Sequence, residues 1–169
     1  MKTLYVIRHA KSSWDDPNQD DFERPLNKRG KKDAPNMAKR LKEKRVTPDF
    51  MITSPAIRAL DTCKQFAKIL DYDKDKIKND KRLYHANEDQ ILTVIRELEE
   101  RKRDKEEVVL LFGHNPGLTE FVNSLIDEYI DNIPTCGVVK IHLKIDRWKE
   151  INVGCGELVF FDFPKRKEE

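Results

Sequence analysis

The chain has 169 residues, the size of one ordinary domain with its own core, so we expect a single domain over residues 1–169. Its 33 lysines and arginines nearly balance its 31 aspartates and glutamates, and the formal net charge of +2 favours neither nucleic acid nor a membrane surface as a partner. No apolar run approaches the roughly 20 residues that span a bilayer, and the first residues carry no secretion signal, so we expect a cytoplasmic protein.

Five segments have the pattern of β-strands. Four are short, continuous apolar runs, and a fifth at 138–145 has a roughly alternating pattern. The apolar runs cover residues 4–7, 50–53, 108–112 and 158–163. Because helical patterns lie between these runs, we expect an α/β fold, a three-layer α/β/α sandwich whose mostly parallel central sheet is flanked by helices.

The first predicted helix covers residues 33–45. Asn27 is a candidate cap for an earlier start, which would place Pro35 inside the helix rather than in its first turn, and the sequence leaves both starts open. The spacing of its apolar residues predicts a stripe that faces the core, formed by Ala34, Met37, Ala38 and Leu41.

Three further helices are predicted. The second begins with Ser54 as its N-cap and Pro55 at its first position. The third runs from about Asn87 to Arg101, its charge-rich end continues as a solvated segment to residue 107, and the fourth begins near Pro116. The residues expected to face the core are Leu60, Cys63, Ala67 and Leu70 in the second helix and Ile91, Ile95 and Leu98 in the third.

Polar residues follow three of the predicted strands directly. The first strand ends in "RHAKSS", the second in "TSPAIR" and the third in "GHNPG". If these strands are parallel neighbours, their carboxyl ends meet, and two arginines and two histidines come together beside a helix N-terminus. Such a cluster suits a phosphate dianion, because each guanidinium can bond two oxygens at once. The residues concerned are Arg8, His9, Arg58 and His114.

The other two histidines lack such a context. His85 follows the apolar "RLY" stretch, and His142 lies within a strand pattern, so we expect both to be structural or simply exposed. An arginine early in a helix or a histidine at a strand end is, taken singly, also more often structural than functional. It is the occurrence of such residues after three separate strands that favours a site.

The motifs "RHA", "SPAIRALDT" and "GHNPGL", together with "RPLNKRG", resemble the histidine phosphatase superfamily, and within it the SixA-type phosphohistidine phosphatases. The resemblance runs from residue 4 to about residue 163. Ala10 departs from the superfamily, most of whose members have glycine after the Arg-His pair, although alanine is common in the SixA-like branch. The resemblance implies a phosphoglycerate mutase-like fold.

The resemblance also implies roles for the clustered residues. His9 would be the nucleophile and become phosphohistidine, Arg8 and Arg58 would hold the phosphoryl oxygens, and His114 would stabilise the transferring group. Lys11 and Ser12 are weaker candidates for binding the substrate. A neutral imidazole is a competent nucleophile near neutral pH when its other nitrogen donates a hydrogen bond.

We expect turnover without a metal ion or any other cofactor. Phosphoryl transfer depends mostly on positioning and charge stabilisation, which a group of cationic donors can supply. No carboxylate cluster of the metal-binding type accompanies the motifs. The three cysteines form no CxxC pair, and we expect them to be buried apolar side chains rather than zinc ligands or disulfide partners.

A general acid is harder to place. Glu88 is the best candidate, although it also fits an ordinary acidic residue in the first turn of a helix. Asp15 and Asp16 in the first loop are further candidates. The imidazole of a phosphohistidine leaves phosphorus more readily than an unactivated alkoxide does. Such a substrate therefore needs less help from an acid.

These observations favour a phosphatase that removes phosphate from phosphohistidine on a protein, such as a histidine-phosphotransfer domain. The chain has no long insertion to build a lid, which suits a phosphate presented by another protein. A small-molecule phosphomonoester phosphatase is the alternative, and a non-catalytic phosphate-binding module is a third reading. Trp14 and Phe22 in the first loop either anchor that loop to the domain or contact a partner.

Overall fold

The computed structural model describes residues 1–101 and 106–165. In these residues six strands form one sheet in the order β3-β2-β4-β1-β5-β6. The first four strands in that order are parallel, whereas β5 runs antiparallel to both of its neighbours. The strands are β1 (Lys2–Arg8), β2 (Phe50–Thr53), β3 (Lys78–Asn79), β4 (Glu107–Gly113), β5 (Val138–Leu143) and β6 (Gly156–Asp162).

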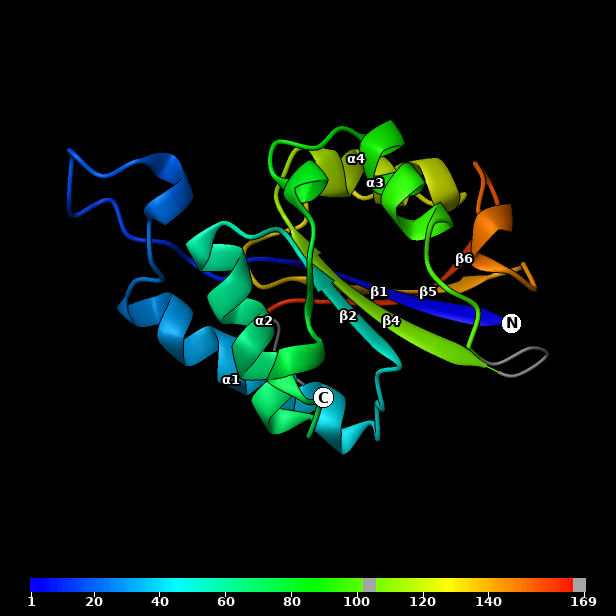
Figure 1. The fold of residues 1–169 in the computed structure, drawn as a ribbon, viewed down its shortest axis with the longest axis horizontal. Helices are drawn as coiled ribbons and strands as arrows, with labels where there is room; N and C mark the ends of the chain where they lie inside the picture. Colours follow the sequence, from blue (N-terminus) through cyan, green and yellow to red (C-terminus); the bar gives the residue numbers. More distant parts are fainter. Residues whose placement is uncertain (102–105, 166–169) are drawn as a thin grey trace.

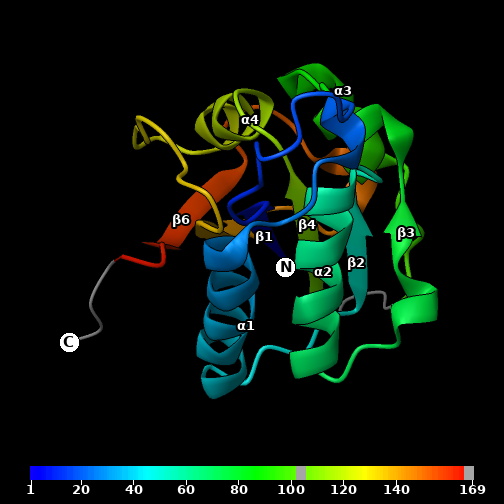
Figure 2. The same cartoon turned by 90° about the vertical axis from the view of Figure 1, so that its left-hand side faces the viewer.

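Helices cover both faces of this sheet. The pair α1 and α2 packs on one face, and the pair α3 and α4 packs on the other (Figure 1, Figure 2). The predicted α/β sandwich with a mostly parallel sheet is therefore confirmed. Among the described residues no helix is both long and apolar enough to cross a membrane. The helices are α1 (Lys28–Glu43), α2 (Ile57–Ile69), α3 (Glu88–Arg96) and α4 (Gly117–Leu125), with short 3₁₀ turns at Asp21–Glu23, Lys74–Lys76, Lys81–Leu83 and Trp148–Glu150.

The central strand β1 is buried on both faces. Leu4 and Val6 pack in the core beneath α3 and α4, whereas Tyr5 and Ile7 pack in the core beneath α1 and α2. Successive side chains of a strand point to opposite faces, so a strand between two helical layers needs apolar residues at every position. This burial fixes the direction in which the polar residues after β1 leave the sheet.

The structure resolves the two alternative starts of the first helix. α1 begins at Lys28, and the side chain of Asn27 accepts a hydrogen bond from the Gly30 amide at 2.8 Å, as an N-cap does. Pro35 consequently lies inside the helix. A Cβ atom on Gly30 would lie 2.1 Å from the carbonyl oxygen of Lys11, so only glycine lets the first loop approach α1 this closely.

The start of the second helix differs from the prediction. Ser54 does not cap the helix, which begins at Ile57 with Ala56 at the cap position. The Ser54 hydroxyl instead accepts a hydrogen bond from the Ala56 amide at 3.2 Å, just before the helix begins. The same hydroxyl also contacts the ring of His114. Leu60, expected in the core, is half-buried, because the buried face of α2 is set by neighbouring residues such as Ala59 and Cys63.

The segment after α3 is also less solvated than expected. The helix ends at Arg96 rather than near Arg101. Glu107, the last residue of the charge-rich run, is fully buried at the start of β4, where it forms an ion pair with the buried Lys2 at 2.5 Å and accepts a hydrogen bond from the Trp148 ring. A buried carboxylate requires such partners. Residues 102–105 of the predicted solvated segment lie outside the described residues.

Candidate active site

The four basic residues singled out in the sequence line one cavity of about 290 Å³. Arg8 is the last residue of β1 and is followed by His9, Arg58 lies in the first turn of α2, and His114 follows β4. Because β2, β4 and β1 are parallel neighbours, these side chains emerge at the same edge of the sheet. The structure thus brings together the residues that the strand-end argument expected to converge.

His9 is held in one tautomer. Its backbone amide donates to the carbonyl of Gly113 at 3.1 Å, and its Nδ1 atom lies 2.7 Å from the carbonyl oxygen of Ala10. A carbonyl can only accept, so Nδ1 carries the proton and Nε2 keeps its lone pair. The pKa of His9 is lowered to about 3, mainly by burial; the Ala10 hydrogen bond raises it, and the charges of Arg58 and Arg8 lower it. The imidazole is therefore neutral near neutral pH.

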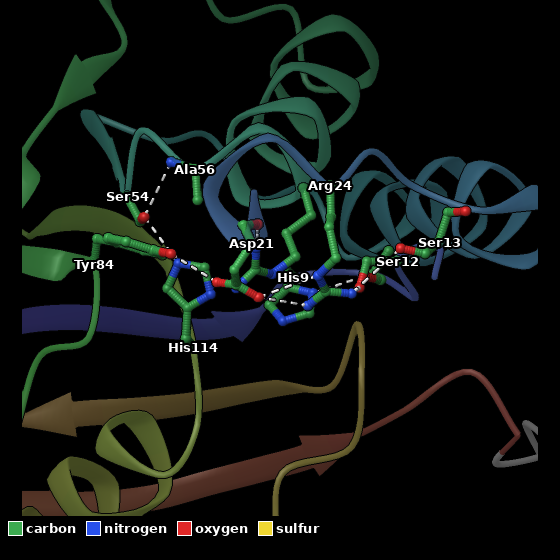
Figure 3. A network of polar contacts seen from close by, with 11 residues as sticks. His9, Ser12, Ser13, Asp21, Arg24, Ser54, Ala56, Tyr84 and His114 are labelled. Carbon is green, nitrogen blue, oxygen red and sulfur yellow. Dashed lines mark hydrogen bonds and ion pairs between the residues drawn. The ribbon is translucent and has the colours of Figure 1, made fainter. Parts of the chain in front are cut away.

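His114 lies beside His9, with 5.2 Å between the ring centroids. Its Nε2 atom is 2.8 Å from the Ser54 hydroxyl, which also accepts from the Ala56 amide (Figure 3). The hydroxyl proton is then available to Nε2, an arrangement that leaves the ring's own proton on Nδ1. Nδ1 is buried and has no hydrogen-bond partner among the described residues. Burial, His9 and Arg58 lower the pKa of His114 to about 3.

Arg8 and Arg58 each donate hydrogen bonds to the protein, but each also has a nitrogen without a partner among the described residues. One terminal nitrogen of Arg8 donates to the Ile133 carbonyl at 3.0 Å, and both terminal nitrogens of Arg58 donate to Asp21, at 2.6 Å to its carbonyl and 3.0 Å to its carboxylate. The Nε atoms of both arginines are buried without a partner in the described part of the chain. Buried donors of this kind are rarely left without an acceptor, which indicates a site for an anionic ligand.

Three more residues of the site escaped the sequence analysis. Asp21 lies between Tyr84 and Arg24 in Figure 3: Tyr84 donates to its carboxylate at 2.7 Å, and Arg24 forms an ion pair with it at 3.1 Å. Burial opposes the ionisation of Asp21, but the Tyr84 hydrogen bond and the Arg58 ion pair outweigh it and hold the pKa of the carboxyl below its usual range. The "RPLNKRG" motif pointed to the segment that contains Arg24, though not to its place in the cavity.

Lys11 and Ser12, the weaker binding candidates, both line the cavity. Lys11 is exposed, whereas Ser12 is buried and its hydroxyl accepts a hydrogen bond from Arg24 at 2.6 Å. Ser12 therefore positions the Arg24 guanidinium at the cavity wall. Because Lys11 is exposed at the edge of the cavity, its ammonium group can contact a ligand there.

The two aromatic residues of the first loop behave differently. Phe22 packs edge-on against the Tyr84 ring, with 5.1 Å between the centroids, and so anchors the loop to the domain. Trp14 is 73% exposed and stacks on the Arg24 guanidinium, which lies 3.6 Å from the ring centroid. Trp14 lines the cavity, and most of its side chain remains accessible to a molecule that approaches.

The remaining histidines also separate. His142 lies on β5 and does not line the cavity, in keeping with a structural position. His85, which we also expected to be structural or exposed, is exposed but lines the cavity, and its ring is 4.0 Å from that of Tyr84. Its backbone has a φ of 58°, a conformation that non-glycine residues seldom adopt.

The candidate acids named from the sequence do not reach the cavity. Glu88 lies in the first turn of α3 and lines a neighbouring surface groove, and neither Asp15 nor Asp16 is among the residues around His9. The carboxylate that does line the cavity is Asp21. Across the described residues, no group of three or more histidine, cysteine or acidic side chains is arranged to hold a metal ion.

The sequence comparisons identify the family. Residues 4–90, just over half of the chain, match the histidine phosphatase superfamily (branch 1). The chain belongs to this superfamily. It is also 37% identical over 70 residues to an uncharacterised chloroplastic protein of Arabidopsis thaliana, a match that covers 41% of this chain and 32% of the plant protein. The chain thus matches about a third of the length of that curated relative.

Solved structures place the fold among the SixA-like members of the superfamily. SixA from Agrobacterium tumefaciens is 25% identical with a TM-score of 0.77, and the two chains are covered to 96% and 97%. The protein histidine phosphatase SixA complexed with tungstate is 20% identical with a TM-score of 0.80 and the same coverage. A phosphoserine phosphatase from Entamoeba histolytica shares the fold at 13% identity, with a TM-score of 0.69 and 98% of both chains covered.

Proposed function

We propose that this protein is a phosphatase that works through a phosphohistidine at His9 and removes phosphate from phosphohistidine on another protein. The observation that carries the proposal is the state of His9, whose Nδ1 proton is held by Ala10 while Nε2 keeps a free electron pair inside a cationic cavity. A buried neutral imidazole among arginines has few structural uses, whereas it is what nucleophilic attack on phosphorus requires.

The cationic groups support phosphoryl transfer without a metal ion. Arg8, Arg58 and Arg24 surround His9 with the positive charge that many phosphoryl-transfer enzymes draw from Mg²⁺. The unpartnered Nδ1 of His114 adds a donor for a phosphoryl oxygen. Tungstate, the ligand of the SixA structure with the same fold, is a tetrahedral oxyanion like phosphate, and its binding there supports an oxyanion site here.

The form of the rim favours a protein substrate. The exposed Trp14 and Lys11 stand at the mouth of the cavity, where they can meet the surface around a phosphorylated side chain. Aromatic side chains are more frequent in protein–protein interfaces than on the rest of a protein's surface. Small phosphate esters also fit a cavity of about 290 Å³, and the Entamoeba relative is named for such a substrate.

One comparison of substrates tests the proposal. The protein is incubated with p-nitrophenyl phosphate and with a phosphorylated histidine-phosphotransfer domain, each with and without EDTA. We expect hydrolysis of both that is insensitive to EDTA, with the higher kcat/KM for the phosphoprotein. A higher kcat/KM for small esters would favour a small-molecule phosphatase, and hydrolysis of neither would leave only a phosphate-binding role.

A further inference from the structure

Among the residues that line the cavity, Asp21 contributes the one carboxylate, and it occupies the groups that should bind phosphate. Its Oδ2 atom lies 3.0 Å from Arg58. The same atom lies 2.7 Å from the Tyr84 hydroxyl, and the Oδ1 atom lies 3.1 Å from Arg24 (Figure 3). One carboxylate therefore contacts three donors, of which Arg58 and Arg24 line the cavity. A phosphoryl group that enters must compete with Asp21 for the two guanidinium groups.

The phosphoryl group is the stronger ligand in this competition. Asp21 carries one negative charge and its side chain is 41% exposed, on a 3₁₀ turn of three residues within the first loop. A phosphate dianion carries more charge and three oxygens, and it matches the planar fork of arginine at least as well as a carboxylate does. The backbone carbonyl of Asp21, at 2.6 Å from Arg58, can keep the loop attached while the carboxylate moves.

When the Asp21 carboxylate loses its contacts with Arg58 and Arg24, its preferred protonation state changes. The Tyr84 hydrogen bond and the Arg58 and Arg24 contacts now favour the ionised carboxylate. When the two arginines turn to the phosphoryl group, only the Tyr84 hydrogen bond remains of these three, and the carboxylate lies beside a second anion. Both the repulsion and the burial of Asp21 then favour the protonated acid. The residue that contacts two of the cavity's arginines in the free protein then carries a proton at the cavity wall.

We propose that Asp21 gives up Arg58 and Arg24 to the incoming phosphoryl group and then serves as the acid and base of the reaction. This inference rests on the proposed function, because it supplies the proton donor for attack by His9. It also supplies an acid that lines the cavity, which Glu88 and the aspartates at 15 and 16 do not.

The two chemical steps balance. In the first, the Nε2 electron pair of His9 forms the bond to phosphorus, the bond from phosphorus to the leaving atom breaks, and that atom takes the proton from Asp21. In the second, the Asp21 carboxylate takes a proton from water as the water oxygen bonds to phosphorus, and the phosphorus–Nε2 bond breaks with its electron pair returning to His9. The net reaction consumes one water and returns His9 to its neutral form and Asp21 to the protonated form that it has in the complex. Asp21 takes this proton from solvent when the phosphoryl group binds and returns it to solvent when phosphate leaves.

The experiment compares wild-type protein with Asp21→Asn and with the matched control Asp20→Asn, an exposed neighbour outside the cavity. Asparagine keeps the shape and one acceptor oxygen of Asp21 but carries neither charge nor a transferable proton. The first arm titrates inorganic phosphate by calorimetry. We expect Asp21→Asn to bind phosphate about tenfold more tightly than wild type, because an internal competitor has been neutralised.

The second arm measures kcat on p-nitrophenyl phosphate and on an alkyl phosphate, whose leaving group needs a proton far more. For Asp21→Asn we expect a loss of about 10²-fold on the alkyl ester and less than about tenfold on the nitrophenyl ester. Equal losses on both esters would rule out the proton role. Weaker phosphate binding would show instead that Asp21 only positions the arginines, and would overturn the exchange.

Two controls keep these outcomes separate from other failures. The melting temperature of Asp21→Asn is compared with that of wild type, and Asp21→Ala repeats both arms if the asparagine variant is unstable. If wild-type protein hydrolyses neither ester, the proposed function fails and the proton role fails with it. The phosphate titration still decides whether Asp21 and phosphate compete for the same arginines.

Discussion

The Nδ1 atom of His9 lies 2.7 Å from the carbonyl oxygen of Ala10, the residue that immediately follows it. The amide of Ala10 in turn donates to the Thr62 hydroxyl at 3.0 Å, and that hydroxyl donates to the Arg58 carbonyl at 2.7 Å. The peptide group after His9 is thereby fixed to α2. The Thr62 hydroxyl therefore connects the peptide group that fixes the tautomer of His9 to the turn of α2 that carries Arg58.

Replacing Thr62 with valine tests this link. Thr62 is fully buried, and valine keeps its shape but removes the hydroxyl, so the Ala10 amide loses its partner. We expect the free energy of unfolding to fall by about 1–3 kcal/mol, the cost of an unsatisfied buried donor. Turnover of p-nitrophenyl phosphate should fall with it. Thr93→Val, at an exposed position on α3, is the control, and an unchanged stability of Thr62→Val would show that the link is dispensable.

Replacing Arg58 with lysine tests the geometry of the anion site apart from its charge. Lysine keeps the positive charge but loses the planar fork that bonds two oxygens. We expect the inhibition constant for inorganic phosphate to rise by about tenfold or more. Arg29→Lys, on α1 and outside the cavity, controls for the exchange itself. An unaltered inhibition constant in Arg58→Lys would mean that only charge matters at this position.

Replacing Ser54 with alanine tests how His114 is held. The substitution removes the 2.8 Å contact to Nε2, which orients the ring and favours a proton on Nδ1. We expect kcat to fall by about 10- to 100-fold while KM changes little, as for the loss of an oriented donor that acts in the transition state. Ser13→Ala, in the first loop, is the control. A change confined to KM would place His114 in substrate binding rather than in stabilising the transferring group.

The stability of the free protein should depend on pH through the two buried histidines. Burial lowers the pKa of both His9 and His114 to about 3, against about 6.5 in an unfolded chain. Their contribution is therefore fully present above about pH 6.5, and it is lost as the pH falls towards 3, because the unfolded state binds protons first. Asp21, whose pKa is also lowered, acts in the same direction at more acidic pH.

The measurement is the free energy of unfolding by urea at a series of pH values between neutral and acidic. We expect His9→Gln to lose part of the pH dependence of wild type, because one buried imidazole no longer takes up a proton on unfolding. His142→Gln, on β5 away from the cavity, should follow wild type. If His9→Gln and wild type ran parallel over the whole range, the neutral state assigned to His9 would be wrong.

The parts of the site predicted from the sequence are those that depend on strand ends. Apolar runs marked β1, β2 and β4, and a parallel sheet brings the residues after such strands to one edge, so Arg8, His9 and His114 could be expected to meet. Arg58 followed because it lies one turn into the next helix. These inferences need only local patterns and one topological rule.

The residues that were missed depend on contacts between distant segments. Asp21 lies in a loop without periodicity, and its partners Arg58 and Tyr84 are 37 and 63 positions away. No local sequence pattern therefore predicts these contacts. Ser54 looked like a helix cap because its type and position suit one, but its hydroxyl serves the Ala56 amide and His114 instead. Glu107 is predicted to be solvated because its partner Lys2 is 105 positions away in the sequence.

The central claim is that His9 becomes phosphorylated through Nε2. The most direct test is to mix the protein rapidly with a ³²P-labelled phosphoprotein or aryl phosphate, quench it in base, and map the label. The account predicts an acid-labile, base-stable phosphoenzyme on the peptide that contains His9, present in His142→Ala and absent from His9→Ala. Label on any other residue, or wild-type turnover by His9→Ala, would contradict it.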